Sequence, residues 1–79
     1  MKYYYIYYYI NHLDYPEQPY FTVKLDHEPT KEEITENRPL NKEIDGYCIK
    51  YRYETTIEGE LLVSKWQIHS LFRYFKNES

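Results

Sequence analysis

The sequence predicts a small α+β domain: an antiparallel sheet in the order β-β-α-β-β-α, with the C-terminal helix packed on one face. The chain has 79 residues, which is enough for a single domain spanning residues 1–79. Runs of β-forming Tyr and Ile residues alternate with two segments that begin like helices. Leu, Ile, Val and Phe make up about 23% of the chain, which is above the level typical of disordered sequences.

Residues 2–13 and 20–26 predict two strands of a hairpin, because β-formers dominate both and two prolines lie between them. Pairing Leu13 with Tyr20 gives each strand one apolar and one more polar face. The predicted core face contains Ile6, Tyr8, Ile10, His12, Phe21, Val23 and Leu25. The other face contains Tyr3, Tyr5, Tyr7, Tyr9, Asn11, Thr22, Lys24 and Asp26. A slip of one residue would exchange the two faces.

A short helix is predicted to begin after Thr30. Thr30 can cap the helix, and Glu33 three positions later completes a capping box. The helix must end by Arg38, because a proline follows. Ile34 is its only apolar residue, so we expect a short and mostly solvated helix.

The segment 39–46 predicts a loop that is anchored by Leu40 and Ile44. Residues 47–57 then predict a third strand, and residues 60–63 a short fourth strand that pairs back after a turn. Alternation assigns the odd positions of the third strand to the core, namely Tyr47, Ile49, Tyr51, Tyr53 and Ile57. The even positions are assigned to solvent, namely Cys48, Lys50, Arg52 and Glu54.

A second capping box, Ser64 with Gln67, predicts a helix from Lys65 to Asn77. Its apolar residues recur at helical spacing. They are Ile68, Leu71, Phe72 and Phe75. We therefore expect this helix to cover the core face of the sheet, with nothing covering the other face.

Composition excludes several function classes. The net charge is −3, whereas free-standing nucleic-acid binders are usually basic. A single cysteine, Cys48, excludes an intrachain disulfide and favours a cytoplasmic location. The chain has no apolar run long enough to span a membrane. No metal or cofactor motif is present, and His12, His27 and His69 fall on different elements. We therefore expect no enzyme and no cofactor, with a nucleophilic Cys48 activated by Lys50 and Arg52 as the remaining alternative.

Carboxylates cluster around the predicted short helix. The group consists of Asp26, Glu28, Glu32, Glu33 and Glu36. They lie on polar segments, without an apolar pocket that would raise a pKa for acid–base chemistry. The group is either a solvated face or an acidic patch for a basic partner.

The tyrosines of the first strand are the most unusual feature. Tyr3, Tyr5, Tyr7 and Tyr9 share one face over about 20 Å. Three interpretations are open: biased composition with rings stacked on Lys24, Lys50 and Arg52, a protein-binding or self-association face, or a base-stacking platform. An uncharged strand of this kind would aggregate at a free edge. It is therefore expected to be internal or paired with a second copy in a homodimer.

Abundant Tyr, Ile, Lys and Asn and the absence of Ala indicate AT-rich codons, as in low-GC bacteria and their phages or plasmids. We therefore predict a phage or mobile-element inhibitor, anti-CRISPR-like, that sterically blocks a host defence protein. The partner would be a larger protein, such as a nucleic-acid-binding effector. The tyrosine face would supply the binding energy, and the carboxylates of residues 26–36 would meet the partner's Lys and Arg. The alternative is a single-stranded nucleic-acid binder that uses the Tyr, Lys and Arg side chains of the sheet.

Overall fold

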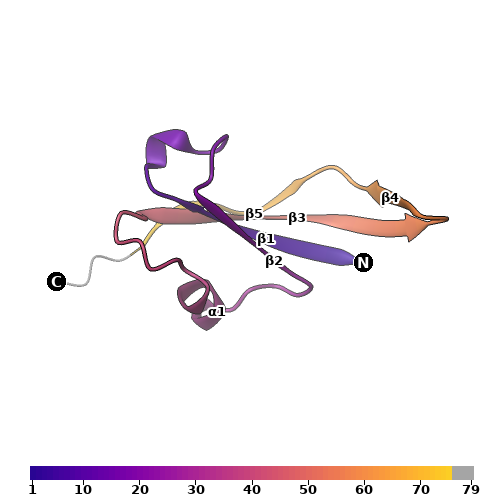
Figure 1. Ribbon diagram of the computed structural model, residues 1–79, viewed down its shortest axis with the longest axis horizontal. Helices are drawn as coiled ribbons and strands as arrows, with labels where there is room; N and C mark the ends of the chain where they lie inside the picture. The colour runs from indigo at the N-terminus through magenta and orange to yellow at the C-terminus, as the bar shows by residue number, and fades with distance from the viewer. Residues whose placement is uncertain (76–79) are drawn as a thin grey trace.

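The computed structural model describes residues 1–75, which form a five-stranded antiparallel sheet with one 3-10 turn and one short α-helix (Figure 1). The elements in chain order are β1 (Lys2–Tyr9), η1 (His12–Asp14), β2 (Phe21–Leu25), α1 (Lys31–Glu36), β3 (Gly46–Ile57), β4 (Glu60–Val63) and β5 (Gln67–Tyr74). In the described residues, no helix is long and apolar enough to cross a membrane.

The sheet has the order β2-β1-β3-β4, and β5 also pairs with β3. β5 pairs with residues 46–51 of β3, while β4 pairs with residues 54–57. The tyrosine-rich β1 is therefore internal, with β2 on one side and β3 on the other. This arrangement confirms one of the two expectations for the aggregation-prone strand.

The predicted C-terminal helix is wrong, and with it the β-β-α-β-β-α fold class, because residues 67–74 form β5. The end of that predicted helix, residues 76–77, lies outside the described residues. Ser64 does not cap a helix: its hydroxyl accepts a hydrogen bond from the Tyr53 N–H at 2.8 Å. The apolar residues of the predicted helix do not share one face. Phe72 contacts Tyr9 on one face of the sheet, while Phe75 stacks on Tyr8 on the other.

The core lies on the face expected from the sequence, but α1 and the loop that follows it form the cover. Ile34 of α1 and Ile44 of the loop are buried against this face. The buried sheet residues in the cluster are Tyr4, Ile6, Tyr8 and Ile49. The Tyr8 hydroxyl donates to the Ile34 carbonyl at 2.6 Å, which satisfies a polar group that would otherwise be costly to bury. Ile44 is confirmed as a loop anchor, whereas Leu40 is fully exposed and the prediction for it is wrong.

The capping box at the start of α1 is confirmed in both directions. The Glu33 N–H donates to the Thr30 hydroxyl, and the Thr30 N–H donates to the Glu33 carboxylate. The helix ends at Glu36, before Arg38 as expected. The Arg38 guanidinium bonds the Ile44 carbonyl at 2.8 Å, which ties the loop back to the end of the helix.

The β1–β2 register differs from the predicted one by four residues. Ile6 lies opposite Val23 and Tyr8 opposite Phe21, so the pairing of Leu13 with Tyr20 is wrong. The strands separate earlier than expected because Asn11 caps η1, accepting from the Leu13 N–H at 2.9 Å. An even shift keeps every strand residue on its predicted face, and the assignment of faces within the two strands is confirmed. His12, however, is exposed on η1 and is not part of the core.

The alternation predicted for β3 fails at both ends of the strand. Cys48 and Glu54, predicted to face solvent, are 1% and 6% exposed, whereas Tyr53 and Ile57 are about half exposed. Tyr9 lies against Cys48, and the side chains of Tyr5, Lys24 and Arg52 surround the Glu54 carboxylate. Lys50 and Arg52 on the same face are only half-buried. The odd face loses its cover beyond Tyr51, where β3 extends into the β3–β4 hairpin (Figure 1).

Candidate interaction face

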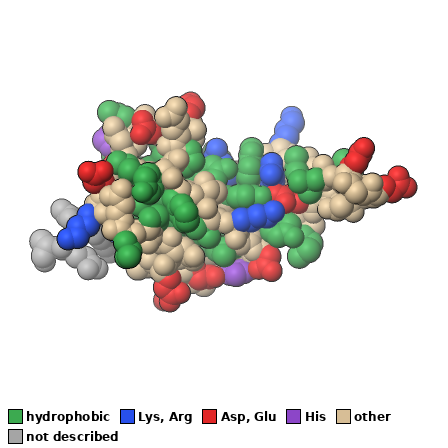
Figure 2. All heavy atoms as spheres, viewed as in Figure 1, with side chains coloured by type: hydrophobic (Ala, Val, Ile, Leu, Met, Phe, Trp, Pro, Cys, Tyr) green, Lys and Arg blue, Asp and Glu red, His purple; other side chains and the backbone are tan. Residues whose placement is uncertain are grey.

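The face of the sheet opposite the core gathers most of the predicted tyrosine and basic residues. In the strand register, Tyr5 lies opposite both Lys24 of β2 and Lys50 of β3, and Tyr3 lies opposite Arg52. We define the aromatic–basic face as Tyr3, Tyr5, Tyr7, Lys24, Lys50, Arg52 and Trp66. In Figure 2, hydrophobic and basic side chains lie next to one another in the right half of the molecule.

Trp66 is the member of the aromatic–basic face that sequence reasoning missed. It lies just before β5, and its ring meets Tyr5 edge-to-face with centroids 4.8 Å apart and Tyr7 at 6.3 Å. The Arg52 guanidinium carbon lies 4.3 Å from the Trp66 ring centroid. Placing this residue in a helix hid the contact, because only a β5 strand beside β3 brings position 66 next to position 52.

Cations cover the tyrosine rings of the face. The Lys24 Nζ lies 4.3 Å from the Tyr3 ring centroid, and the Lys50 Nζ lies 5.3 Å from that of Tyr7. These distances fall within the range of cation–π attraction. The expected stacking of rings on Lys24, Lys50 and Arg52 is therefore present, and it fixes the aromatic side chains in place.

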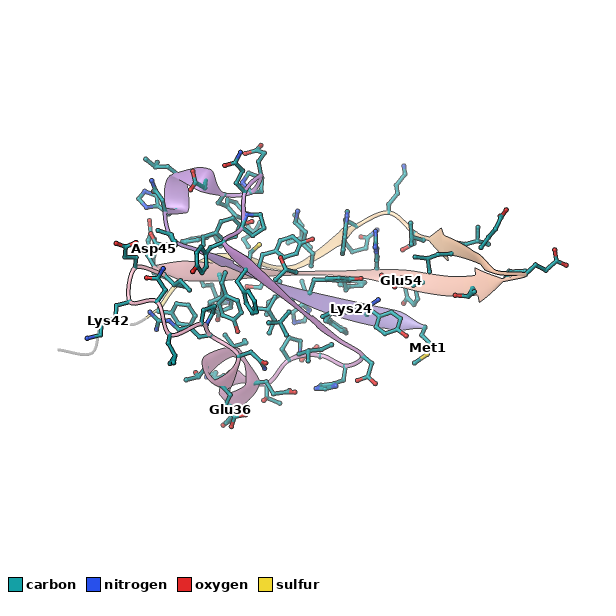
Figure 3. All side chains as sticks on the ribbon, in the orientation of Figure 1. Met1, Lys24, Glu36, Lys42, Asp45 and Glu54 are labelled. Atoms are coloured by element: carbon teal, nitrogen blue, oxygen red, sulfur yellow. The ribbon has the colours of Figure 1, made fainter. Side chains whose placement is uncertain are left out.

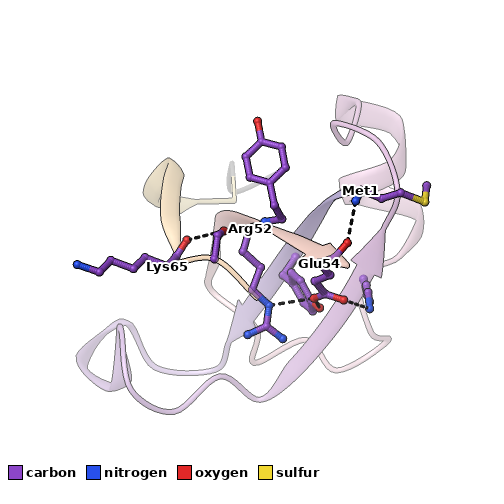
Figure 4. Close-up of polar contacts among 8 residues, drawn as sticks. Met1, Arg52, Glu54 and Lys65 are labelled. Atoms are coloured by element: carbon purple, nitrogen blue, oxygen red, sulfur yellow. Dashed lines mark hydrogen bonds and ion pairs between the residues drawn. The ribbon is translucent and has the colours of Figure 1, made fainter. Parts of the chain in front are cut away.

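A buried carboxylate, Glu54, holds the aromatic–basic face together (Figure 4). Its Oε1 accepts from the Lys24 Nζ at 2.7 Å, and its Oε2 accepts from the Arg52 Nε at 2.9 Å. The Tyr5 hydroxyl also donates to Oε2. The amino group of Met1 donates to the Glu54 backbone carbonyl at 2.7 Å. Figure 3 shows Met1, Lys24 and Glu54 close to one another where the β3–β4 hairpin leaves the body of the molecule, away from Glu36 on α1.

These bonds set the charge state of Glu54. Hydrogen bonds from Lys24, then Tyr5 and Arg52, lower the pKa of Glu54 to about 2 and outweigh the opposite effect of burial. The carboxylate is therefore ionised at neutral pH and offsets part of the charge of the neighbouring cations. The sequence contained a signal for this role, because Glu54 shares the even face of β3 with Arg52.

Tyr9 is fully buried and contributes nothing to the exposed surface. Its predicted place in a binding face with Tyr3, Tyr5 and Tyr7 is therefore wrong. Its ring lies 5.8 Å from Phe72 and 5.7 Å from Tyr15. Its hydroxyl donates to the Pro16 carbonyl at 3.1 Å and lies 3.8 Å from the Cys48 sulfur. Burial raises the pKa of both the Tyr9 hydroxyl and the Cys48 thiol. A buried, protonated thiol is not an activated nucleophile.

The predicted acidic group lies around α1, on the opposite side of the sheet from the aromatic–basic face (Figure 1 and Figure 2). His27 bridges two of its members, with Nδ1 2.8 Å from Asp26 and Nε2 2.5 Å from Glu33. Hydrogen bonds that the His27 ring donates to Asp26 and then Glu33 raise the pKa of His27. Glu28 lies 3.6 Å from the His69 ring nitrogen. Glu32 and Glu36 are exposed on α1.

The three histidines pair with different carboxylates, and His12 pairs with Asp45 at 3.5 Å. Among residues 1–75, no group of three or more His, Cys, Asp or Glu could hold a metal ion. Comparison with known proteins gave no relationship: no family model, no curated protein and no solved structure matches the chain.

Proposed function

We propose that the protein is a non-enzymatic protein-binding module and that the aromatic–basic face is its binding surface. The observation that carries the proposal is the fixed cluster of Tyr, Trp and Arg side chains around Glu54. These residue types dominate the energetics of protein interfaces. Because the side chains are already held by hydrogen bonds and ring contacts, binding would cost little conformational entropy.

The geometry favours a protein over a nucleic acid. A single-strand binder needs cations free for phosphate and ring faces free for bases. Lys24 and Arg52 instead share the Glu54 carboxylate, and the rings of Tyr5 and Tyr7 meet Trp66 edge-to-face. The net charge of −3 also disfavours binding to a nucleic acid. Single-stranded nucleic-acid binding through Tyr5, Tyr7 and Lys50 stays as the alternative.

The acidic group would not join the same interface. A partner seated on the aromatic–basic face would have to wrap around the edge of the sheet to reach Glu32 and Glu36 on α1 (Figure 1). We therefore do not propose that one partner binds both the tyrosines and the carboxylates of residues 26–36. The narrower prediction, a phage or mobile-element inhibitor of a nucleic-acid-binding host protein in the cytoplasm, rests on composition and stays a prediction.

We expect Tyr7→Ala and Trp66→Ala each to weaken partner binding by about tenfold or more, because each removes an aromatic anchor. Tyr53→Ala is the matched control, since Tyr53 is about half exposed and shares the core-side face of the sheet with Lys2 and Tyr51. The tagged full chain would capture proteins from nuclease-treated lysate of the source cells. Dissociation constants of the purified partner would then be measured for the three variants.

Two outcomes would contradict the proposal. One is equal affinity of wild type, Tyr7→Ala and Trp66→Ala for the captured protein. The other is binding of the wild-type chain to a poly-dT oligonucleotide at low salt that weakens steeply with added salt and is lost in Tyr7→Ala. The second outcome would establish the nucleic-acid alternative instead.

A further inference from the structure

We infer that two copies of the chain associate through their β4 strands in a twofold-symmetric dimer. The β3–β4 hairpin projects from one end of the molecule, whose longest dimension is 51 Å (Figure 1). All side chains of residues 55–63 are exposed. In the described residues, β4 pairs with β3 alone, so its outer edge is open. This inference is independent of the proposed binding role of the aromatic–basic face.

The hairpin is apolar on both faces. Leu61 and Val63 share one face, whereas Ile57 and Leu62 share the other. Leu61 is 59% exposed and Leu62 is 49% exposed. Protruding apolar surface of this kind marks an interaction site. A partner that extends the sheet would cover side chains on both faces at once, which a partner stacked on one face cannot do.

The other edges of the sheet carry features that oppose strand pairing. β2 lies between Pro19 and Pro29 and contains Lys24. β5 is irregular, with two register shifts against β3. Charges, prolines and bulges are the usual means of blocking a free edge. β4 has a regular register and contains neither a proline nor a lysine.

The main chain of β4 fits a twofold pairing. The tight turn at Glu58–Gly59, with both residues at positive φ, makes Ile57 and Glu60 the pair that closes the hairpin. Hydrogen-bonded pairs then alternate along the ladder, so Leu62 bonds β3 while the N–H and C=O groups of Leu61 and Val63 point outward. In a twofold pair, Leu61 bonds Val63 of the second copy, and the two Leu62 side chains meet at the axis.

Charge complementarity selects a second copy as the occupant. In this antiparallel pairing, the tip of one hairpin lies along the base of the other. The tip carries Glu58 and Glu60, and the base of β4 is followed by Lys65. Glu60 falls opposite Ser64 of the second copy, one residue from its Lys65. Like charges are kept at opposite ends of the interface, and unlike charges are brought together at both ends.

Sedimentation equilibrium of the full chain, from micromolar to millimolar concentration, tests the pairing. We expect a monomer–dimer equilibrium for the wild type. Leu62→Lys places two ammonium groups at the axis and should raise the dimer dissociation constant by about tenfold or more. Leu40→Lys makes the same charge change at a fully exposed loop position and should leave the constant unchanged.

Two cysteine variants provide a second test, which does not depend on the affinity of the dimer. Residues facing each other at a non-hydrogen-bonded position have Cβ atoms about 4.5–5.5 Å apart, close to disulfide geometry. Added diamide should therefore convert Leu62→Cys to a covalent dimer at low protein concentration, and Leu40→Cys should react far more slowly. A monomeric wild type together with equal cross-linking of the two variants would overturn the inference. Open-ended oligomers would overturn it too, because they require β4 to pair with a different edge.

Discussion

We expect Gly46→Ala to lower the free energy of unfolding by about 3 kcal/mol. A Cβ at this position would lie 2.5 Å from the Arg73 carbonyl oxygen and would overlap the Phe72 ring. The Arg73 oxygen belongs to the backbone of β5, so relief requires β5 to move away from β3. Urea denaturation of the wild type and the variant, monitored by circular dichroism, gives the difference.

Gly59→Ala is the control for this substitution. Gly59 has φ +83°, and nothing lies within 4 Å of the added Cβ, so the cost is backbone strain alone, about 1 kcal/mol. A loss at Gly46 that is no larger than the loss at Gly59 would show that β5 does not lie against β3.

We expect Glu54→Gln to destabilise the fold by about 2 kcal/mol at neutral pH. The substitution leaves Lys24 and Arg52 without the carboxylate that accepts their hydrogen bonds. It also weakens the bond from the Tyr5 hydroxyl. Urea denaturation at pH 7 measures the loss, and Glu60→Gln on the exposed strand β4 is the matched control, which should lie within about 0.5 kcal/mol of the wild type.

The loss of stability caused by Glu54→Gln should also depend on pH. The folded-state pKa of Glu54 is about 2, below the ordinary value of 4.5. Its stabilising contribution is therefore complete above about pH 4.5 and is lost as the pH falls towards 2. The stability difference between wild type and Glu54→Gln should shrink over that interval. A difference that stays constant from pH 7 to pH 2 would show that Glu54 is not ionised in the folded protein.

Local signals in the sequence predicted some elements correctly, although the predicted fold class was wrong. Strand alternation in β1 and β2 assigned each side chain to its face, because an error of four residues in register leaves the faces unchanged. The Thr30–Glu33 capping box predicted the start of α1. Both features depend on residues close together in the sequence, which explains why they could be inferred without the structure.

The C-terminal segment could not be predicted because two local patterns agreed on the wrong structure. Ile68, Leu71, Phe72 and Phe75 have helical spacing, yet the register shifts in β5 break the two-residue period that would have marked a strand. Ser64 and Gln67 matched a capping box, but the hydroxyl of Ser64 bonds the backbone of Tyr53. Pairing with β3, a contact distant in sequence, decides the conformation.

The aromatic–basic face was predicted in part. Tyr3, Tyr5 and Tyr7 were correctly grouped with the basic side chains of β2 and β3, since alternation fixes which residues share a face. Trp66 was missed because it was placed in a helix, and Glu54 because it was assigned to solvent. Tyr9 was misplaced because its burial depends on Tyr15 and Phe72, which the predicted fold did not bring near it.

Site-specific photo-cross-linking in the source cells tests the central claim most directly, namely that the aromatic–basic face binds a protein. The photoreactive residue p-benzoyl-phenylalanine would replace Tyr7 in one variant and Tyr53 in another. These positions lie on opposite faces of the sheet. We predict a cross-linked protein band from position 7 that is weak or missing from position 53. Equal bands from both positions, or a band from position 53 alone, would contradict the claim.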